Sequence, residues 1–136
     1  MSFKTHEIAY LKSADLGRLA TLAPDGTLQN SPVGFHYNER LGTLDVYGYN
    51  LAKSRKFRNI ATNNTVAFVV DDIVSHDPWR VRCLEVRGTA QQAEDAKGDP
   101  LIRIIPKRII SFGIDDTETE PHDLVPDSRD VPTAAQ

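Results

Sequence analysis

The sequence of 136 residues lacks several features that mark common classes of protein. Its single cysteine, Cys83, cannot form an intramolecular disulfide, which fits a reducing compartment. No apolar run approaches the ~20 residues that a membrane-spanning helix needs, so no membrane partner is expected. The N-terminal residues carry no basic segment followed by an apolar one, so we expect no secretory signal and a cytoplasmic location. Length and composition together predict one soluble globular domain.

Motifs of several reaction classes are also missing. The four histidines lie in separate segments and no Cys/His cluster has metal-ligand spacing, so we predict no metal site. There is no G-x-S-x-G motif of the serine hydrolases, and no G-x-G-x-x-G follows a predicted strand as in a Rossmann fold. Asp71 and Asp72 would point to opposite faces of a strand and cannot act as a catalytic pair. Without an evident nucleophile we assign no catalytic residue, and the sequence favours a protein whose bound cofactor carries the chemistry.

Charge is distributed unevenly along the chain. Residues 115–136 contain seven acidic side chains and one arginine, so the preceding residues carry a net charge of +3 although the whole chain carries −3. The same segment contains three prolines and few apolar residues, a composition typical of extended or disordered chain. We therefore expect a folded domain over residues 1–114 and an acidic, solvated tail over residues 115–136.

Alternating apolar residues bounded by turn signals predict a mainly β fold. Pro24-Asp25-Gly26 is a turn signature between two such runs and predicts a hairpin. The expected strands are 18–23, 27–36, 43–48, 65–73, 80–92, 101–105 and 108–114, and helices are expected near Thr5 and over residues 52–63. About seven antiparallel strands with one or two helices close most economically as a small barrel, because closure removes exposed strand edges.

The most informative segment is Lys53–Ile60, which places four basic side chains within six residues. Phe57 and Ile60, three positions apart, would anchor one face of a helix to the core. The basic side chains then have two interpretations. Either they form a solvated face, or they bind a phosphate, which would satisfy the cations and the free N–H groups of the first helical turn together.

Several segments resemble the pyridoxamine 5′-phosphate oxidase-like split β-barrel proteins. In chain order they are Gly17–Thr21, Asp25-Gly26, Ser31-Pro32-Val33, Ser54–Ile60, Asn63–Ala67, Val70–Asp72, Pro78–Arg82 and Glu85–Ala90. The first three are similar to the opening hairpin of that family, and Ser54–Ile60 is similar to its phosphate-binding helix. The likeness covers roughly residues 5–114. Trp79–Arg82 and Ile109–Gly113 look most like the actinobacterial branch that uses the deazaflavin coenzyme F420.

The resemblance implies a homodimer that binds its cofactor in two grooves at the subunit interface. Carried over position by position, Lys56, Asn59 and Arg55 would contact the cofactor phosphate. Lys53 and Arg58 are less directly placed, because one helix cannot aim all of these side chains at a single site.

The remaining site residues follow from the same resemblance. Ser31, Pro32 and Val33 would line the cofactor ring, with Tyr47 and Gly48 on the adjoining strand. Asp72, Trp79 and Arg80 would come from the partner subunit or from the mouth of the pocket. Each of these residues also has a structural interpretation. Pro32 and Val33 could be part of the barrel wall, Tyr47 could pack across strands, and Trp79 could anchor a loop in the dimer contact.

The implied activity is that of an oxidoreductase that binds F420 and transfers hydride to a small organic acceptor, with the proton supplied by solvent, Tyr47 or His36. FMN is the alternative cofactor, because both cofactors carry a phosphate on a ribityl chain. A non-catalytic carrier of a cofactor or tetrapyrrole is a third hypothesis. Nucleic-acid binding is not expected, because one short basic cluster without an aromatic platform makes a poor binding surface. The short chain and acidic tail differ from true pyridoxamine phosphate oxidases, so that reaction is not expected.

Overall fold

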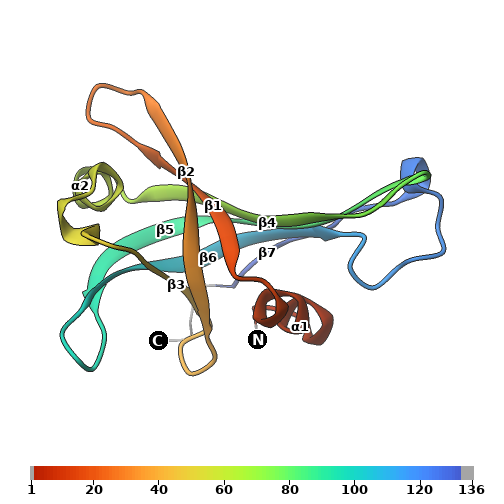
Figure 1. The fold of residues 1–136 in the computed structure, drawn as a ribbon, viewed down its shortest axis with the longest axis horizontal. Coiled ribbons are helices and arrows are strands. Elements are labelled where there is room, and N and C mark those ends of the chain that lie inside the picture. Colours follow the sequence, from red (N-terminus) through yellow and green to blue (C-terminus); the bar gives the residue numbers. More distant parts are fainter. Residues whose placement is uncertain (1, 133–136) are drawn as a thin grey trace.

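A computed structural model of the chain describes residues 2–132. Its strands form one antiparallel sheet in the order β3-β2-β1-β4-β5-β6-β7, and β3 also pairs with β6, which closes the first six of these strands into a barrel (Figure 1). The strands are β1 (Leu16–Leu22), β2 (Leu28–Asn38), β3 (Thr43–Tyr47), β4 (Thr65–His76), β5 (Trp79–Glu94), β6 (Pro100–Phe112) and β7 (Asp127–Asp130). The helices are α1 (Thr5–Ser13) and α2 (Arg55–Thr62), with short 3₁₀ turns η1 (Leu51–Lys53) and η2 (Pro121–Asp123). The predicted mainly β split barrel of about seven antiparallel strands is confirmed.

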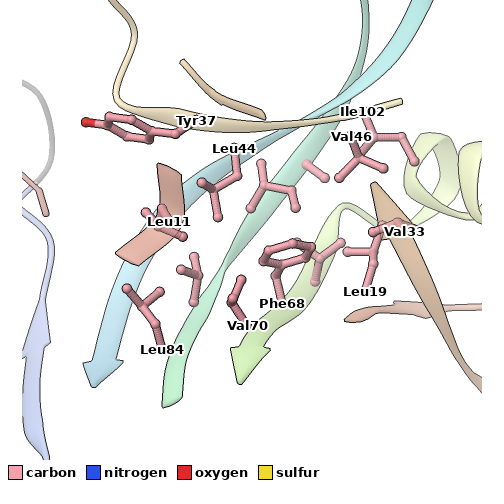
Figure 2. Close-up of a cluster of buried hydrophobic side chains, with 14 of the residues drawn as sticks. Leu11, Leu19, Val33, Tyr37, Leu44, Val46, Phe68, Val70, Leu84 and Ile102 are labelled. Atoms are coloured by element: carbon pink, nitrogen blue, oxygen red, sulfur yellow. The ribbon is translucent and has the colours of Figure 1, made fainter. Parts of the chain in front are cut away.

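The core fills the inside of the barrel and is formed by alternate residues of each strand (Figure 2). Phe68 of β4 lies at its centre and is 1% exposed. Gly17 of β1 makes room for this ring, because a Cβ at Gly17 would lie 2.1 Å from the Cζ of Phe68. Leu11 of α1 packs into the same cluster, so α1 covers one part of the core.

Strand β6 runs without interruption where the sequence predicted two strands separated by Pro106. Pro106 pairs with Gly88 at a register shift in the β5–β6 ladder. A proline is tolerated at such a bulge because the ladder there does not need its missing N–H. The predicted strands 101–105 and 108–114 are therefore one strand, Pro100–Phe112.

The seventh strand comes from the segment that was expected to be a solvated tail. β7 pairs with β6, with Arg129 opposite Ile109. The Nη1 of Arg129 donates to Glu7 of α1 at 3.1 Å, and the Glu7 side chain is fully buried. The expectation is therefore wrong for residues 127–130, because the one basic side chain of the tail pairs with a buried carboxylate 122 residues away. Residues 133–136 lie outside the described part of the chain.

The molecule is elongated along the β4–β5 hairpin (Figure 1). Helix α2 lies at one end of the long axis, and the tip of this hairpin lies at the other. Within residues 2–132, no helix is long and apolar enough to cross a membrane.

Candidate functional site

Helix α2 begins where the hydroxyl of Ser54 caps its first turn. The Ser54 Oγ accepts a hydrogen bond from the Phe57 N–H at 3.3 Å and donates one to the carbonyl of Leu51 at 2.6 Å. This cap separates the η1 turn from α2, so the predicted helix over residues 52–63 is shorter by three residues at its start. Phe57 and Ile60 pack against the core, as predicted. The basic side chains of the segment are thereby held on the outward face.

Among residues 2–132, the four basic side chains of this segment find no acidic partner. No carboxylate oxygen of residues 2–132 lies within 4.0 Å of the charged group of Lys53, Arg55, Lys56 or Arg58. The Arg58 Nη1 donates to the carbonyl of Lys53 at 3.0 Å, which holds Arg58 against the helix start. The N–H groups of Arg55 and Lys56 in the first turn also lack intrahelical partners, whereas that of Phe57 is capped by Ser54. This donor set, cations beside a helix N-terminus, fits a phosphate group.

Asn59 is a structural residue of α2. It is 2% exposed, and its Nδ2 donates to the Oγ1 of Thr21 at 3.0 Å and to the Oε1 of Gln29 at 3.2 Å. Both amide hydrogens are therefore occupied by the β1–β2 hairpin. These two hydrogen bonds attach α2 to the barrel, and they leave no amide hydrogen of Asn59 for the phosphate contact that the sequence predicts.

The three residues predicted to line the cofactor ring face different sides of β2. Val33 is 5% exposed and points into the core (Figure 2), so it is barrel wall and cannot contact a ring bound outside the barrel. Pro32 is exposed on the opposite face. The Ser31 Oγ is buried and makes no hydrogen bond within residues 2–132. An unpartnered buried hydroxyl usually has a reason, such as a bound ligand or water.

A cavity of about 750 Å³ lies beside the start of α2, and we call it the Tyr47–Lys53 groove. Its wall is formed by residues 47–53 together with Gly34, Asp99 and Pro100. The predicted residues Tyr47 and Gly48 thus lie in one cavity with the first cation of the basic segment. Sequence reasoning missed Tyr49, whose side chain is fully exposed at the groove. Asn50 adopts φ 52° and turns the chain at this point. The signal in the sequence was the pair Tyr49-Asn50, because asparagine tolerates a left-handed turn and such a turn can expose the aromatic residue beside it.

Asp72 lies on β4, and its carboxylate already accepts hydrogen bonds from two side chains of the same chain. The Nε of Arg82 donates to Asp72 at 2.9 Å, and the Tyr10 hydroxyl donates to it at 2.8 Å. The hydrogen bond from Arg82 is the main cause that lowers the pKa of Asp72. Burial of Tyr10 is the largest cause that raises the pKa of its hydroxyl, and the hydrogen bond to Asp72 raises this pKa further. Asp72 therefore joins α1 to the β4–β5 hairpin, and the predicted cofactor contact is not supported within one chain.

Trp79 and Arg80 lie at the tip of the β4–β5 hairpin. Trp79 is 55% exposed, and its ring meets the His76 ring edge-on at 5.8 Å. The Arg80 Nη2 donates to the carbonyl of Thr119 at 2.6 Å, which attaches the acidic segment to the hairpin.

The predicted site residues therefore fall into two groups. Ser31, Tyr47, Arg55 and Lys56 belong to β2, β3 and the start of α2. Asp72, Trp79 and Arg80 belong to the β4–β5 hairpin, whose tip lies at the opposite end of the molecule from α2 (Figure 1). A single chain does not bring the two groups together.

The fold defines a split β-barrel, and the start of α2 presents basic side chains that have no acidic partner within residues 2–132. Residues 5–123 match the family model described as pyridoxamine 5′-phosphate oxidase. A 5a,11a-dehydrotetracycline/5a,11a-dehydrooxytetracycline reductase of Streptomyces rimosus subsp. rimosus is 43% identical over 122 residues, which are 85% of this chain and 86% of the relative. The chain belongs to the pyridoxamine 5′-phosphate oxidase family. The prediction of an oxidoreductase is confirmed by this relative, which is a reductase.

Solved structures agree with the fold. A conserved hypothetical protein from Mycobacterium tuberculosis superposes with a TM-score of 0.67 at 21% identity, over 83% of this chain and 86% of that one. An FAD binding protein from Mycobacterium smegmatis superposes with a TM-score of 0.59 at 26% identity, over 79% of this chain and 92% of that one.

Proposed function

We propose that this oxidoreductase binds coenzyme F420 with its phosphate at the start of α2. We further propose that it transfers hydride to a conjugated carbon–carbon double bond of a planar polycyclic acceptor. The observation that carries the proposal is the set of four cations that have no acidic partner within residues 2–132, the first of which, Lys53, lines the Tyr47–Lys53 groove. The 43% identical relative, a dehydrotetracycline reductase, supports both the reaction and the acceptor class.

Recognition of the phosphate falls to Arg55 and Lys56. Both follow the Ser54 cap directly, where the free N–H groups and the partial positive charge of the helix start also act on an anion. Lys53 and Arg58 extend the positive charge away from this point. Four cations exceed what one phosphate needs, which favours F420 over FMN because F420 carries the longer anionic tail.

The Tyr47–Lys53 groove supplies the wall for the cofactor ring. Its lining is mainly apolar at the Gly48–Ala52 side, which suits a planar ring, and its charged residues are one cation, Lys53, and one carboxylate, Asp99. When bound, the reduced cofactor supplies the hydride that the acceptor receives. The protein's contribution is to hold the two molecules at a reacting distance of ~3–3.5 Å and to exclude water from the ring.

A second copy of the chain would complete the site. The hairpin tip exposes three large apolar side chains, Ile73, Val74 and Trp79, which single-chain packing leaves in water. An exposed apolar cluster of this kind marks a protein interface. A homodimer that places this hairpin beside the α2 of its partner would unite the two groups of predicted residues.

The test is a titration of the purified chain with F420 and with FMN, followed by cofactor fluorescence. Lys56→Ala should weaken F420 binding by about 1.5–3 kcal/mol, the loss expected for a charge-assisted contact. Lys107→Ala is the matched control, because Lys107 is an exposed lysine of β6 outside the groove. Unchanged affinity of Lys56→Ala would remove Lys56 from the site.

FMN is the second candidate cofactor, and the FAD binding protein among the structural neighbours favours it. Tighter binding of FMN than of F420 would assign the chain to flavin chemistry. Tight binding without turnover of any conjugated acceptor would instead favour the carrier hypothesis.

A further inference from the structure

A second cavity, of about 780 Å³, lies between α1 and strands β2, β3 and β6, and we call it the Arg103 chamber. Tyr47 lines both this chamber and the Tyr47–Lys53 groove. The two cavities therefore share Tyr47 as a wall residue, which places a molecule in the chamber beside the proposed cofactor groove.

Three polar residues form a row across the wall of the chamber. His36 of β2 is opposite Asp45 of β3, and Asp45 is opposite Arg103 of β6. Tyr47 is two positions after Asp45 and so shares its face of β3. All four side chains line the chamber, which places them around one space although they come from three strands.

The Asp45–Arg103 pair is the fixed part of this row. The Nε and Nη2 of Arg103 both donate to the Asp45 carboxylate at 3.1 Å. The Asp45 side chain is 3% exposed and that of Arg103 is 19% exposed. Asn38 and Thr43 donate to the same carboxylate, each at 3.0 Å. The orientation of the guanidinium is therefore set by a saturated, buried acceptor.

One end of this guanidinium stays available. The Nη1 of Arg103 makes no hydrogen bond within residues 2–132, although Arg103 lines the chamber. Because Asp45 compensates the positive charge, the pair attracts a permanent anion only weakly. It offers N–H donors to an oxygen that is neutral at first and becomes negative during a reaction, which is the arrangement that stabilises an oxyanion.

We propose that the Arg103 chamber is the acceptor subsite of the reductase, in which Arg103 binds the carbonyl oxygen conjugated to the reduced double bond. Asp45 is the positioning residue of Arg103. This inference rests on the proposed function and assigns its acceptor as a conjugated enone.

The electron balance explains why this oxygen needs a donor. Hydride adds to the carbon of the double bond that is remote from the carbonyl. The bonding pair then moves to the carbonyl oxygen, which becomes an enolate, and a proton returns to the carbon beside the carbonyl. The acceptor gains two hydrogens, and the deazaflavin or flavin is oxidised by two electrons. Arg103 acts at the moment when the oxygen carries the negative charge.

The other charges of the chamber fit a polyoxygenated acceptor better than a simple anion. Lys12 and Glu39 form an ion pair at the chamber wall. Arg40 adds one further positive charge, and Asp15, Glu94 and Asp95 add three negative charges. A permanently anionic ligand would be repelled by these carboxylates. A neutral or zwitterionic planar molecule with several oxygens meets donors at Arg103 and acceptors at the acidic residues.

The test uses tetracycline as a non-reacting planar probe with enolised dicarbonyl groups, bound to the F420-loaded chain. Arg103→Gln alone would leave Asp45 as a buried unpaired charge and could unfold the chain. We therefore compare Arg103→Lys, which keeps the charge but loses the second donor arm, with the double variant Asp45→Asn/Arg103→Gln, which removes both charges. Arg87→Gln is the matched control, because Arg87 pairs with Glu85 on the exposed surface of β5.

Both variants should bind tetracycline at least tenfold more weakly than the unmodified chain, while their F420 affinity stays within twofold. On a reducible conjugated acceptor, kcat should fall more than KM rises, because the contact strengthens in the transition state. Arg87→Gln should match the unmodified chain in both assays.

Unchanged probe binding and unchanged kcat in either folded variant would overturn the proposal, as would failure of the unmodified chain to bind tetracycline. Loss of the dimer in both variants would also overturn it, because the pair would then be an interface contact. Failure of the proposed function is distinct, since it would appear as the absence of F420 and FMN binding in every protein tested.

Discussion

The contact between Arg129 of β7 and Glu7 of α1 gives a sharp test of how the two ends of the chain are held. Glu7 is 0% exposed. Its carboxylate accepts hydrogen bonds from the Ser111 hydroxyl at 2.6 Å, from the Lys4 N–H at 2.8 Å and from the Arg129 Nη1 at 3.1 Å. Arg129 is the only cation among these partners. Arg129→Ala therefore leaves a buried negative charge with two hydrogen bonds and no counter-charge.

The expected loss follows from that geometry. Removing one partner of a buried ion pair costs about 3–5 kcal/mol, and the two remaining hydrogen bonds place Arg129→Ala at the lower end, about 3 kcal/mol. For a chain of this size such a loss lowers the melting temperature by roughly 10 °C. Urea unfolding followed by tryptophan fluorescence measures the loss directly, because the midpoint falls while the slope stays constant.

The loss should depend on pH in a defined direction. Burial alone would raise the pKa of Glu7, but the hydrogen bonds from Arg129, Ser111 and Lys4 outweigh it and lower that pKa. A carboxyl whose folded pKa is lowered contributes stability above its unfolded pKa of about 4.3 and loses it as the pH falls through the folded value. The difference between the unmodified chain and Arg129→Ala should therefore be largest near pH 7 and should shrink below about pH 4.

Arg108→Ala is the matched control on the same pair of strands. Arg108 bonds Asp130, but this pair is exposed on the surface, where ion pairs contribute about 0–1 kcal/mol. Equal losses for Arg129→Ala and Arg108→Ala, or a loss below about 0.5 kcal/mol for Arg129→Ala, would refute the assignment of Glu7 as a buried anchor of β7.

Three further changes test other parts of the structure. Asn59→Ala should lower the free energy of unfolding by about 2–3 kcal/mol in urea, because the buried Thr21 hydroxyl loses its partner. Amide hydrogen exchange should become faster in α2 than in the sheet, and equal acceleration in both would contradict this role of Asn59. Gly88→Ala should abolish soluble folding or cost more than about 3 kcal/mol, because its Cβ would lie 2.1 Å from the backbone oxygen of Ile105, and a variant of normal stability would show that the bulge is not rigid. Burial raises the pKa of Cys83 to about 11, so its thiol should react with iodoacetamide at pH 8 at least ~100-fold more slowly than free cysteine, and fast labelling would show that the thiol is accessible and ionised.

The hairpin of β1 and β2 shows what local sequence can predict. Pro24-Asp25-Gly26 marks the turn, and Gly26 adopts φ 87°, a conformation that glycine adopts without steric cost. The Asp25 Oδ1 accepts from the Thr27 N–H at 3.0 Å, which closes the turn within three residues. The interactions that close this turn lie within the turn itself, so the sequence contains the information directly.

Polar side chains of the site were harder to interpret, because their partners are distant in sequence. Asn59 resembled a phosphate contact on α2 until the fold brought Thr21 to its amide, 38 positions away. Arg103 gave no signal at all, since Asp45 lies 58 positions away. A sequence pattern indicates which side chains could bind a ligand, but it does not indicate which of them already have a protein partner.

The tail was misread for a related reason. Average composition describes residues 115–136 as acidic and rich in proline, which is typical of solvated chain. The order of residues 127–130 as strand β7 depends on one residue, Arg129, and on the buried carboxylate of Glu7 near the other end of the chain. A single specific pair can outweigh a compositional average, because the counter-charge for a buried acid, about 3–5 kcal/mol, offsets much of the roughly 4–8 kcal/mol that ordering the backbone of four strand residues costs.

The same reasoning applies to the division of the candidate site between two ends of the molecule. Trp79 of the β4–β5 hairpin is 55% exposed, and Arg55 and Arg58 of α2 are exposed as well. The tip of the hairpin and α2 lie at opposite ends of the molecule (Figure 1). Neither feature lowers the free energy of an isolated chain, since the aromatic ring stays in water and the cations repel one another. Both become favourable when a second copy covers the ring and a phosphate lies among the cations. We therefore expect dimer formation and F420 binding to be coupled: Trp79→Ser should weaken both in analytical ultracentrifugation and in titration, whereas Lys56→Ala should weaken cofactor binding and leave the dimer intact. A monomeric Trp79→Ser variant that binds F420 with unchanged affinity would show that one chain holds the complete cofactor site.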